Sequence, residues 1–244
     1  MDTITSVSGL VRYVETTLYE GLHLFRGQRR DKELLPKIGR DRFLSPHFLD
    51  EERRLLDDFK IRSKPYLDSS KRTDWDWLAI AQHNGMATRL LDWTDNPLAA
   101  LWFAVRERAE EGSHAVLWVF HVPKQDAVTD QEKTHPFKGK RTKVFRPKHL
   151  THTIVAQGGW FTVHKYMENK KRFIPFEKIA AYKGCRERLV IPADKFYELK
   201  AQLNRVGIND SSMFPGLRGL CDYLNWIHLP QLAVPRFPRT SAGR

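Results

Sequence analysis

The sequence predicts a single α+β domain in which helices flank a small mixed or antiparallel sheet. Amphipathic helical stretches and short apolar runs alternate along the 244 residues, and no internal repeat is visible. Hydrophobic residues make up 41% of the chain and include seven Trp, which is enough to bury a core. Because no break in composition divides the chain, we expect one domain over residues 7–228 and a basic tail rich in Pro and Arg over 229–244.

Three helices and one strand are expected in the first third of the chain. Apolar residues at helical spacing follow a Ser cap and predict a helix over 7–18, and Ser45-Pro46 begins a second one that continues to Phe59. Asp74 can cap a third helix over 75–83, which Gly85 ends. Between the first two helices, the apolar run Leu22–Phe25 predicts a buried strand that ends on Arg26.

The later elements follow from proline, glycine and apolar patterns. Asn96 as a polar cap and Pro97 at the first helical position predict an Ala-rich helix over 98–109. Strands are expected at 114–122, 153–156, 160–163 and 189–191, and helices at 194–206 and 215–227.

The net charge of +12 is concentrated in one part of the chain. Lys124 to Arg188 holds sixteen Lys and Arg against six Asp and Glu, so it carries ten of the twelve excess charges. The densest stretch contains Lys133, Lys138, Lys140, Arg141, Lys143, Arg146 and Lys148. Such a stretch predicts a polyanionic partner such as DNA or RNA, contacted through Lys138, Lys140, Arg141 and Lys143, and a solvated loop is an equally consistent interpretation.

Several classes of protein are disfavoured by what the sequence lacks. No window approaches 18 uninterrupted apolar residues and no signal peptide is visible, so we expect neither membrane insertion nor secretion. Two Cys without close spacing fit the reducing cytoplasm. Glycine-rich phosphate loops, the nucleophile elbow of hydrolases and zinc-protease motifs are missing, and His149 with His152 has no further ligand nearby, so no metal site is predicted.

Three polar motifs lie where a core does not need them. Arg26 follows an apolar strand beside Gly27 and can hold a phosphate or carboxylate, or instead form a structural ion pair. The polar residues of Gln82–Thr94 precede a helix N-terminus, which suits either anion binding or a capping network. In the third motif, Gln157 stands beside two glycines and the ring pair Trp160-Phe161, where a flat ligand could stack or a bulge could adjoin core aromatics.

These motifs resemble the FRG domain family, which is named for an aromatic-Arg-Gly motif. That motif is present as Phe25-Arg26-Gly27-Gln28. The family block H-x-G-x-x-T-R-L-L-D-W-T stands at His83 to Thr94, an A-Q-x-G-x-F element stands at Ala156 to Phe161, and a terminal element covers Gly207 to Leu220. The resemblance extends from about Val7 to Ile227 and links the chain to bacterial and phage-related proteins with roles in defence or as toxins.

The order of the motifs is also similar to that of ADP-ribosyltransferases, which implies an ADP-ribosyltransferase-like fold and NAD as the ligand. The resemblance implies catalytic roles for Arg26, Thr88, Arg89, Asp92 and Gln157, and NAD contacts for Arg26, Gly27, Gln28, His83, Trp160 and Phe161. Gln157 departs from the acid usual at the third position, because an amide is neutral and cannot act as a base. Asp92, Glu168 or Glu187 could supply the carboxylate. The alternative is a nucleic-acid or nucleotide-binding module without catalysis that uses the basic stretch 133–148.

Overall fold

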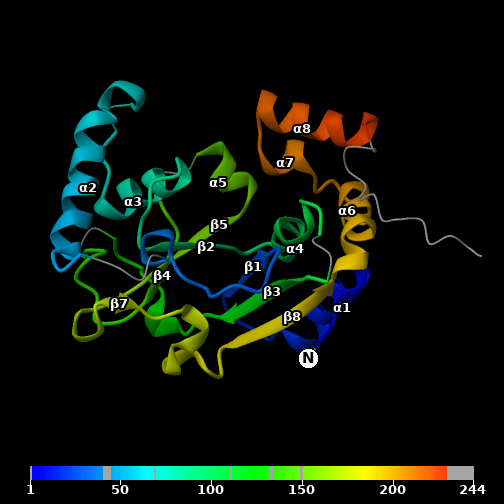
Figure 1. The fold of residues 1–244 in the computed structure, drawn as a ribbon, viewed down its shortest axis with the longest axis horizontal. Helices are drawn as coiled ribbons and strands as arrows, with labels where there is room; N and C mark the ends of the chain where they lie inside the picture. Colours follow the sequence, from blue (N-terminus) through cyan, green and yellow to red (C-terminus); the bar gives the residue numbers. More distant parts are fainter. Residues whose placement is uncertain are drawn as a thin grey trace, which may run out of the picture.

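The computed structural model describes residues 2–40, 45–68, 70–109, 112–131, 134–148 and 151–229. Its centre is a six-stranded antiparallel sheet with the strand order β4-β5-β2-β1-β3-β8 (Figure 1). The six strands are β1 (His23–Gln28), β2 (Leu90–Thr94), β3 (His114–His121), β4 (Lys143–Phe145), β5 (Gly159–Val163) and β8 (Arg186–Pro192). A separate two-stranded sheet pairs β6 (Tyr166–Met167) with β7 (Arg172–Phe173).

Eight α-helices are found within the described residues. They are α1 (Val7–Thr17), α2 (Phe48–Arg62), α3 (Asp74–His83), α4 (Pro97–Val105), α5 (His152–Ala156), α6 (Phe196–Arg205), α7 (Asp210–Met213) and α8 (Leu217–His228). The predicted α+β class is therefore confirmed, and the sheet is antiparallel rather than mixed.

Helices cover one face of the sheet. Over β1, β3 and β8 this face packs against α1, α4 and α6, in a core that includes Phe25, Leu117 and Trp102. Over β2, β4 and β5 the same face meets α2, α3 and α5 through residues such as Leu90 and Phe161. In Figure 1, α2, α3 and α5 lie above the left part of the sheet, α4 and α6 lie to the right and α1 lies at the lower right beside β8, with α7 and α8 at the top between α5 and α6.

The opposite face is covered by loops and short 3₁₀ helices. Leu24, Trp93 and Phe120 project from it and pack against Phe176 and Tyr182, which belong to the 3₁₀ helices Phe176–Lys178 and Ala180–Tyr182. Both faces of the sheet are thus buried, and polar side chains on the strands need partners within the protein.

The middle of the sheet pairs incompletely. β1 pairs with β3 along all six of its residues, whereas the ladder between β1 and β2 contains the single pair Phe25 and Thr94. The residue after Phe25 in β1 is Arg26, and the residues before Thr94 in β2 are Asp92 and Trp93. Polar side chains can therefore enter the sheet where β1 and β2 part.

Side-chain caps confirm two of the expected helix starts and correct a third. Ser6 Oγ accepts from the Gly9 amide at the start of α1, and Asn96 accepts from the Leu98 and Ala99 amides ahead of Pro97 in α4. At α3 the cap is Thr73 rather than Asp74. Its hydroxyl accepts from the Asp76 amide while the Asp76 carboxylate accepts in return, which forms a capping box.

Several expectations about the remaining elements were wrong or incomplete. Residues 153–156 were expected to form a strand but belong to α5, because the Thr151 hydroxyl caps the helix by accepting from the Ile154 amide. β2 was not assigned from the sequence, since Asp92 and Thr94 interrupt its apolar pattern. The basic β4 and the short α7 were also missed, and the last helix begins at Leu217 rather than at residue 215.

Some sequence-based expectations concern parts of the chain that the structure leaves out. The proposed basic tail begins at residue 229, and of it only Leu229 is described; Lys133 and His149 also lie outside the described residues. Across the described ranges, the model contains no helix that is long and apolar enough to cross a bilayer. The same ranges hold no group of three His, Cys, Asp or Glu side chains arranged to bind a metal ion.

Candidate functional site

Arg26 lies in the gap where β1 and β2 part. Its Nη1 donates to the Asp92 backbone oxygen at 2.6 Å and lies 3.7 Å from the Asp92 carboxylate Oδ2. Its Nε is buried and has no hydrogen-bond partner among the described residues. An unsatisfied buried donor on a guanidinium costs free energy, so contacts within the described residues do not fully account for Arg26.

The Asp92 carboxylate is held in a fixed orientation from the helical side. Gln82 of α3 donates through Nε2 to both carboxylate oxygens, at 3.3 Å and 3.1 Å. The Gln82 Oε1 in turn accepts from the Thr88 hydroxyl at 2.6 Å, which fixes which end of the amide faces Asp92. Because 57% of the Asp92 side chain remains exposed, the site presents an oriented carboxylate to solvent beside a guanidinium.

Two further basic groups affect the charge around this pair. Burial lowers the pKa of His83, and the Asp92 carboxylate opposes that shift, so the two side chains feel each other. Burial also lowers the pKa of Arg26, with Asp92 raising it and the nearby Arg40 lowering it further. An Arg stays protonated in either case, so Arg26 and Arg40 bring two positive charges to the gap.

A cavity of about 420 Å³ lies beyond the end of β1 and is lined by Gln28, Lys32, Glu33, Leu35 and Arg40, and neither Arg26 nor Asp92 lines it. The Gln28 Oε1 accepts from the Trp118 indole at 3.2 Å, which leaves its amide nitrogen for another acceptor. The segment that carries Arg40 contacts the segment Gln82–Thr94, because the Ile38 amide donates to the Thr88 backbone oxygen at 3.4 Å. Arg26, Gln28, Arg40 and Asp92 thus form the candidate site.

Gly27 serves the packing of a helix. A Cβ on Gly27 would lie 1.9 Å from the Ala100 backbone oxygen and 2.7 Å from the Ala104 nitrogen, both in α4. The expectation that Gly27 lets a ligand approach the backbone is therefore wrong, because α4 fills the space over this residue.

Gln157 is directed to another part of the structure. Its Nε2 donates to the Met213 oxygen of α7 at 3.1 Å, and its backbone oxygen accepts from the Thr94 hydroxyl at 2.6 Å. These contacts tie α5 to α7 and to the end of β2. Gln157 was expected to share a pocket with Arg26, but its amide is used in this structural link.

The two aromatic residues after Gln157 separate. Phe161 is 4% exposed and stacks on Phe145 in the core under α3, so it offers no surface to a flat ligand. Trp160 points to the other face, where its indole donates to Asp95 at 3.0 Å and the Arg146 guanidinium lies 5.6 Å from the ring centre. The expected stacking platform is thus not formed by this pair.

Arg89 forms a buried ion pair with Glu52 of α2, both side chains being less than 5% exposed. Its Nε donates to Glu52 Oε1 at 2.8 Å and its Nη2 to Oε2, while the Phe137 ring lies 4.6 Å from the guanidinium. The resemblance implied a catalytic role for Arg89 beside Thr88. The structure gives Arg89 a different acid, which comes from a helix far away in the sequence.

The other acids considered for the site lie elsewhere. Glu187 of β8 accepts from the Tyr13 hydroxyl at 2.7 Å and lies 2.7 Å from His121 Nε2 at the far edge of the sheet. Glu168 begins an exposed 3₁₀ helix after β6. Asp92 is therefore the carboxylate that the structure places beside Arg26.

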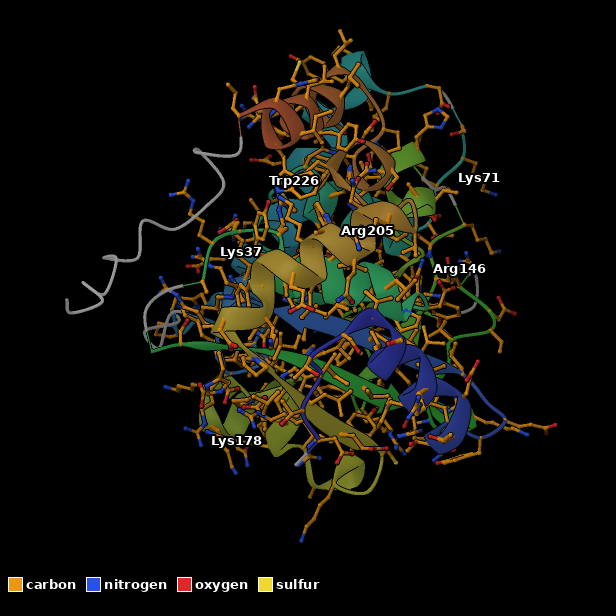
Figure 2. All side chains as sticks on the ribbon, turned by 90° about the vertical axis from the view of Figure 1, so that its right-hand side faces the viewer. Lys37, Lys71, Arg146, Lys178, Arg205 and Trp226 are labelled. Carbon is orange, nitrogen blue, oxygen red and sulfur yellow. The ribbon has the colours of Figure 1, made fainter. Side chains whose placement is uncertain are left out.

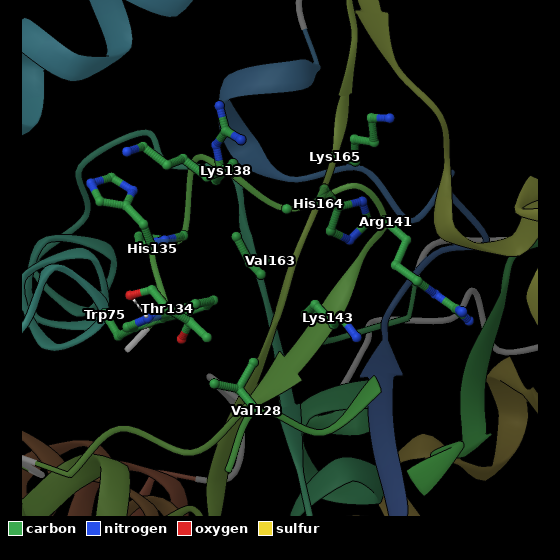
Figure 3. Close-up of a pocket in the computed structure, with 13 residues that line it drawn as sticks. Trp75, Val128, Thr134, His135, Lys138, Arg141, Lys143, Val163, His164 and Lys165 are labelled. Carbon is green, nitrogen blue, oxygen red and sulfur yellow. Dashed lines mark hydrogen bonds between the residues drawn. The ribbon is translucent and has the colours of Figure 1, made fainter. Parts of the chain in front are cut away.

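The basic stretch contributes to a second cavity, of about 510 Å³, beside β4 and β5 (Figure 3). Lys138, Arg141 and Lys143 line it, together with His164 and Lys165 from the end of β5, whereas the exposed Lys140 does not. Arg141 and Lys143 also bind the fully buried Asp126, at 2.7 Å and 3.4 Å. Other basic residues, such as Lys71, Arg146, Lys178 and Arg205, project from separate parts of the surface (Figure 2).

His164 couples stability to pH, and its titration can be predicted. The ring is 1% exposed, and burial, followed by the charges of Arg26 and Arg89, lowers its pKa to about 3. Its Nε2 lies 3.2 Å from the Thr162 hydroxyl, whose oxygen also accepts from the Trp93 indole at 3.0 Å. Below the unfolded pKa of about 6.5 the imidazole is protonated in the unfolded chain but stays neutral in the folded chain. The free energy of unfolding therefore falls as the pH falls.

We expect this residue to cost about 2 kcal/mol of stability between pH 6.5 and pH 5, from the unfolded pKa and 1.36 kcal/mol per unit. Urea unfolding of wild type and His164→Gln at both pH values measures it. The variant should lose less stability over this interval than the wild type does. Equal losses would show that the imidazole takes up a proton in the folded state.

Sequence reasoning missed several residues that the structure brings to these sites. Gln82 stands inside the polar segment Gln82–Thr94 that was singled out, and its position in the last turn of α3 was the available signal. Arg40 and His164 carried no local motif, since one reaches the site from a loop and the other follows a strand. Asp126 was visible only as an acid ahead of a basic stretch.

Comparison with known families agrees with part of the sequence interpretation. The FRG domain model matches residues 22–113, which include Arg26, Gln28, Arg40, Gln82 and Asp92. No curated protein and no solved structure matches the chain. The match to the FRG domain model thus covers residues 22–113, and the wider bounds of 7–228 remain a prediction.

Proposed function

We propose that this protein is an NAD-dependent enzyme of the ADP-ribosyltransferase type, with Arg26 and Asp92 at its active site. One observation carries the proposal: a buried, unpartnered Arg26 Nε lies beside the oriented and exposed Asp92 carboxylate. Cleavage of NAD needs both a cationic group for the pyrophosphate and an anionic group for the ribose cation. The two groups occur together in the gap between β1 and β2.

NAD would act as a substrate, and the residues present fit its charge. Arg26 can donate to the pyrophosphate through Nε, and Arg40 adds a second positive charge. The free amide nitrogen of Gln28 is suited to a ribose hydroxyl in the adjoining cavity. His83, whose pKa burial lowers, is neutral near pH 7 and leaves the Asp92 carboxylate unpaired on its exposed side.

The reaction breaks the bond between the ribose C1′ and the nicotinamide nitrogen. Both electrons of this bond leave with nicotinamide, which becomes neutral, and positive charge develops on the ribose. The Asp92 carboxylate stabilises that charge, because Gln82 and Thr88 hold it in place before the reaction. A nucleophile on a protein or nucleic acid then bonds to C1′ and releases its proton, and water in its place gives hydrolysis of NAD.

This assignment accounts for the neutral Gln157. An amide cannot supply the negative charge that the ribose cation needs, and Gln157 already donates to Met213. Asp92 comes from β2 rather than from the region of β5. The site therefore contains a carboxylate even though the third motif has none.

We expect Asp92→Asn to lower NAD turnover by about 10²- to 10⁴-fold, the range for a lost catalytic carboxylate. The amide retains the shape of the side chain, so the fold should persist, and circular dichroism would check this. Purified protein is incubated with cell extract and NAD labelled in either the adenine or the nicotinamide half. The adenine label should enter an acceptor, and the nicotinamide label should be released.

Asp222→Asn is the matched control, since this partly exposed acid pairs with Arg218 on the surface of α8. It should retain full turnover. Wild-type protein that is folded yet neither transfers label nor releases nicotinamide would refute the proposed activity. Equal turnover in Asp92→Asn and wild type would refute the role of Asp92.

A further inference from the structure

The cavity beside β4 and β5 collects positive charge from three separate segments of the chain. Arg89 precedes β2, Lys138 and Arg141 belong to the loop before β4, Lys143 begins β4, and Lys165 follows β5. None of the described lining residues is an acid. Figure 3 shows His135 and Lys138 at one end of the cavity and His164, Arg141 and Lys165 at the other.

Buried acids neutralise part of this positive charge. Glu52 pairs with Arg89, and the buried Asp126 is shared by Arg141 and Lys143. Within the described residues, neither Lys138 nor Lys165 forms an ion pair with an acid, and both are exposed at the rim. Asp126 balances only one of the two charges of Arg141 and Lys143, and Lys138 and Lys165 add two more. The cavity therefore has an excess of positive charge.

The inner surface of the cavity is rigid. His164 is 1% exposed and lies under the rim, with its Nε2 held by the Thr162 hydroxyl at 3.2 Å. Arg89 is fixed by Glu52 and by the Phe137 ring against its face. A ligand would therefore meet a preformed inner wall, and only the two rim lysines would have to be ordered on binding.

The shape of the cavity favours a small ligand over a nucleic-acid strand. Its volume of about 510 Å³ lies in the range of small-molecule sites. Sequence-tolerant binding of a single strand uses exposed aromatic rings on which bases stack. The one lining Trp, Trp75, is 2% exposed, and its indole donates to the Thr134 oxygen at 3.3 Å, so it offers no such surface.

We propose that this cavity is a second site, separate from Arg26 and Asp92, that binds a compact small molecule carrying several phosphate groups. The phosphates would lie between Lys138 and Lys165 and accept from both ammonium groups. Lys143 and Arg141 would contact the same ligand from the side of β4. A nucleotide polyphosphate and a phosphorylated sugar alcohol share this chemistry.

Calorimetric titration of the whole chain with inorganic tripolyphosphate tests the proposal. We expect Lys138→Ala and Lys165→Ala each to weaken binding about tenfold, as for a lost charged hydrogen bond. Lys140→Ala is the matched control, because Lys140 is exposed and adjacent in sequence but does not line the cavity. It should bind tripolyphosphate as wild type does.

Three results would overturn the proposal. One is the absence of tripolyphosphate binding to folded wild type. Another is an equal loss of affinity in Lys140→Ala and Lys138→Ala, which would indicate a general charge effect. The third is tighter binding of a single-stranded oligonucleotide, with affinity that rises with its length, which would indicate an open nucleic-acid surface.

The test of phosphate binding can fail or succeed independently of the test of NAD turnover. Lys138→Ala and Lys165→Ala should leave NAD turnover unchanged, since neither side chain lines the cavity that adjoins Arg26. Titration with ATP and with inositol hexakisphosphate then distinguishes a nucleotide from a phosphorylated sugar alcohol as the source of the phosphates. Tighter binding of one of them would identify the class of natural ligand.

Discussion

Gly27→Ala is expected to destabilise the protein by about 3 kcal/mol or more, at the upper end of the cost of overpacking a core. The added methyl group would overlap the Ala100 backbone oxygen of α4, at 1.9 Å, and crowd the Ala104 nitrogen. Both contacts are backbone atoms within a helix, so neither can turn aside as a side chain would. Either α4 moves off β1 or β1 shifts within the sheet.

Gly184→Ala provides the control for this substitution. A Cβ at Gly184 meets no atom within 4 Å, so its replacement should change stability by no more than about 0.5 kcal/mol, as is usual for surface positions. Urea unfolding followed by circular dichroism measures both variants. Similar stability of Gly27→Ala and wild type would show that α4 and β1 are not packed this closely.

Glu52→Ala is expected to destabilise the fold by about 3–5 kcal/mol, the cost of leaving one partner of a buried ion pair without the other. Arg89 would remain charged among Phe137 and Phe173 with no acid beside it. The same urea titration measures this loss. Removal of the exposed Arg218, which pairs with Asp222 on the surface of α8, should have an effect below about 1 kcal/mol.

The double variant Glu52→Leu with Arg89→Met separates the penalty of an unpaired charge from a general loss of packing. Apolar replacement of a buried pair is often neutral or stabilising, so the double variant should be clearly more stable than Glu52→Ala. If it were less stable than Glu52→Ala, the ion pair itself would contribute more than its desolvation costs.

The residues of the polar motifs fall into two groups. Arg26 and Asp92 meet in the gap between β1 and β2, and their neighbours Gly27 and Arg89 serve packing and a buried ion pair. Adjacent residues of a strand point to opposite faces, so one motif can supply both a site and a core. A motif alone therefore does not tell which of its residues contact a ligand.

Much of the fold was predictable where the signals were local. Ser6, Asn96 and Pro97 began helices because their side chains or rings act within one turn of the chain. β2 was not predicted because Asp92 and Thr94 are polar, and their partners in α3 and α5 are unknown from the sequence. Three of residues 153–156 are β-branched, which favours a strand. The Thr151 hydroxyl nevertheless caps a helix there by accepting from the Ile154 amide.

The candidate site was predictable in part for the same reason. The proximity of Arg26 to Asp92 follows from the pairing of β1 with β2, which the sequence did not show. Gln157 was misplaced because its side chain is held by Met213, more than fifty residues later, in a helix that was not expected. Glu52 could not be matched to Arg89 without knowing where α2 packs.

The central claim is that NAD binds at Arg26, and calorimetric titration of NAD into wild type and Arg26→Lys tests it most directly. A lysine keeps the positive charge but lacks the Nε donor and the planar fork, so we expect binding to weaken by about tenfold or more. Lys138→Ala should bind NAD as wild type does. Equal affinity in wild type and Arg26→Lys, or a loss of NAD binding in Lys138→Ala, would contradict the assignment of the site.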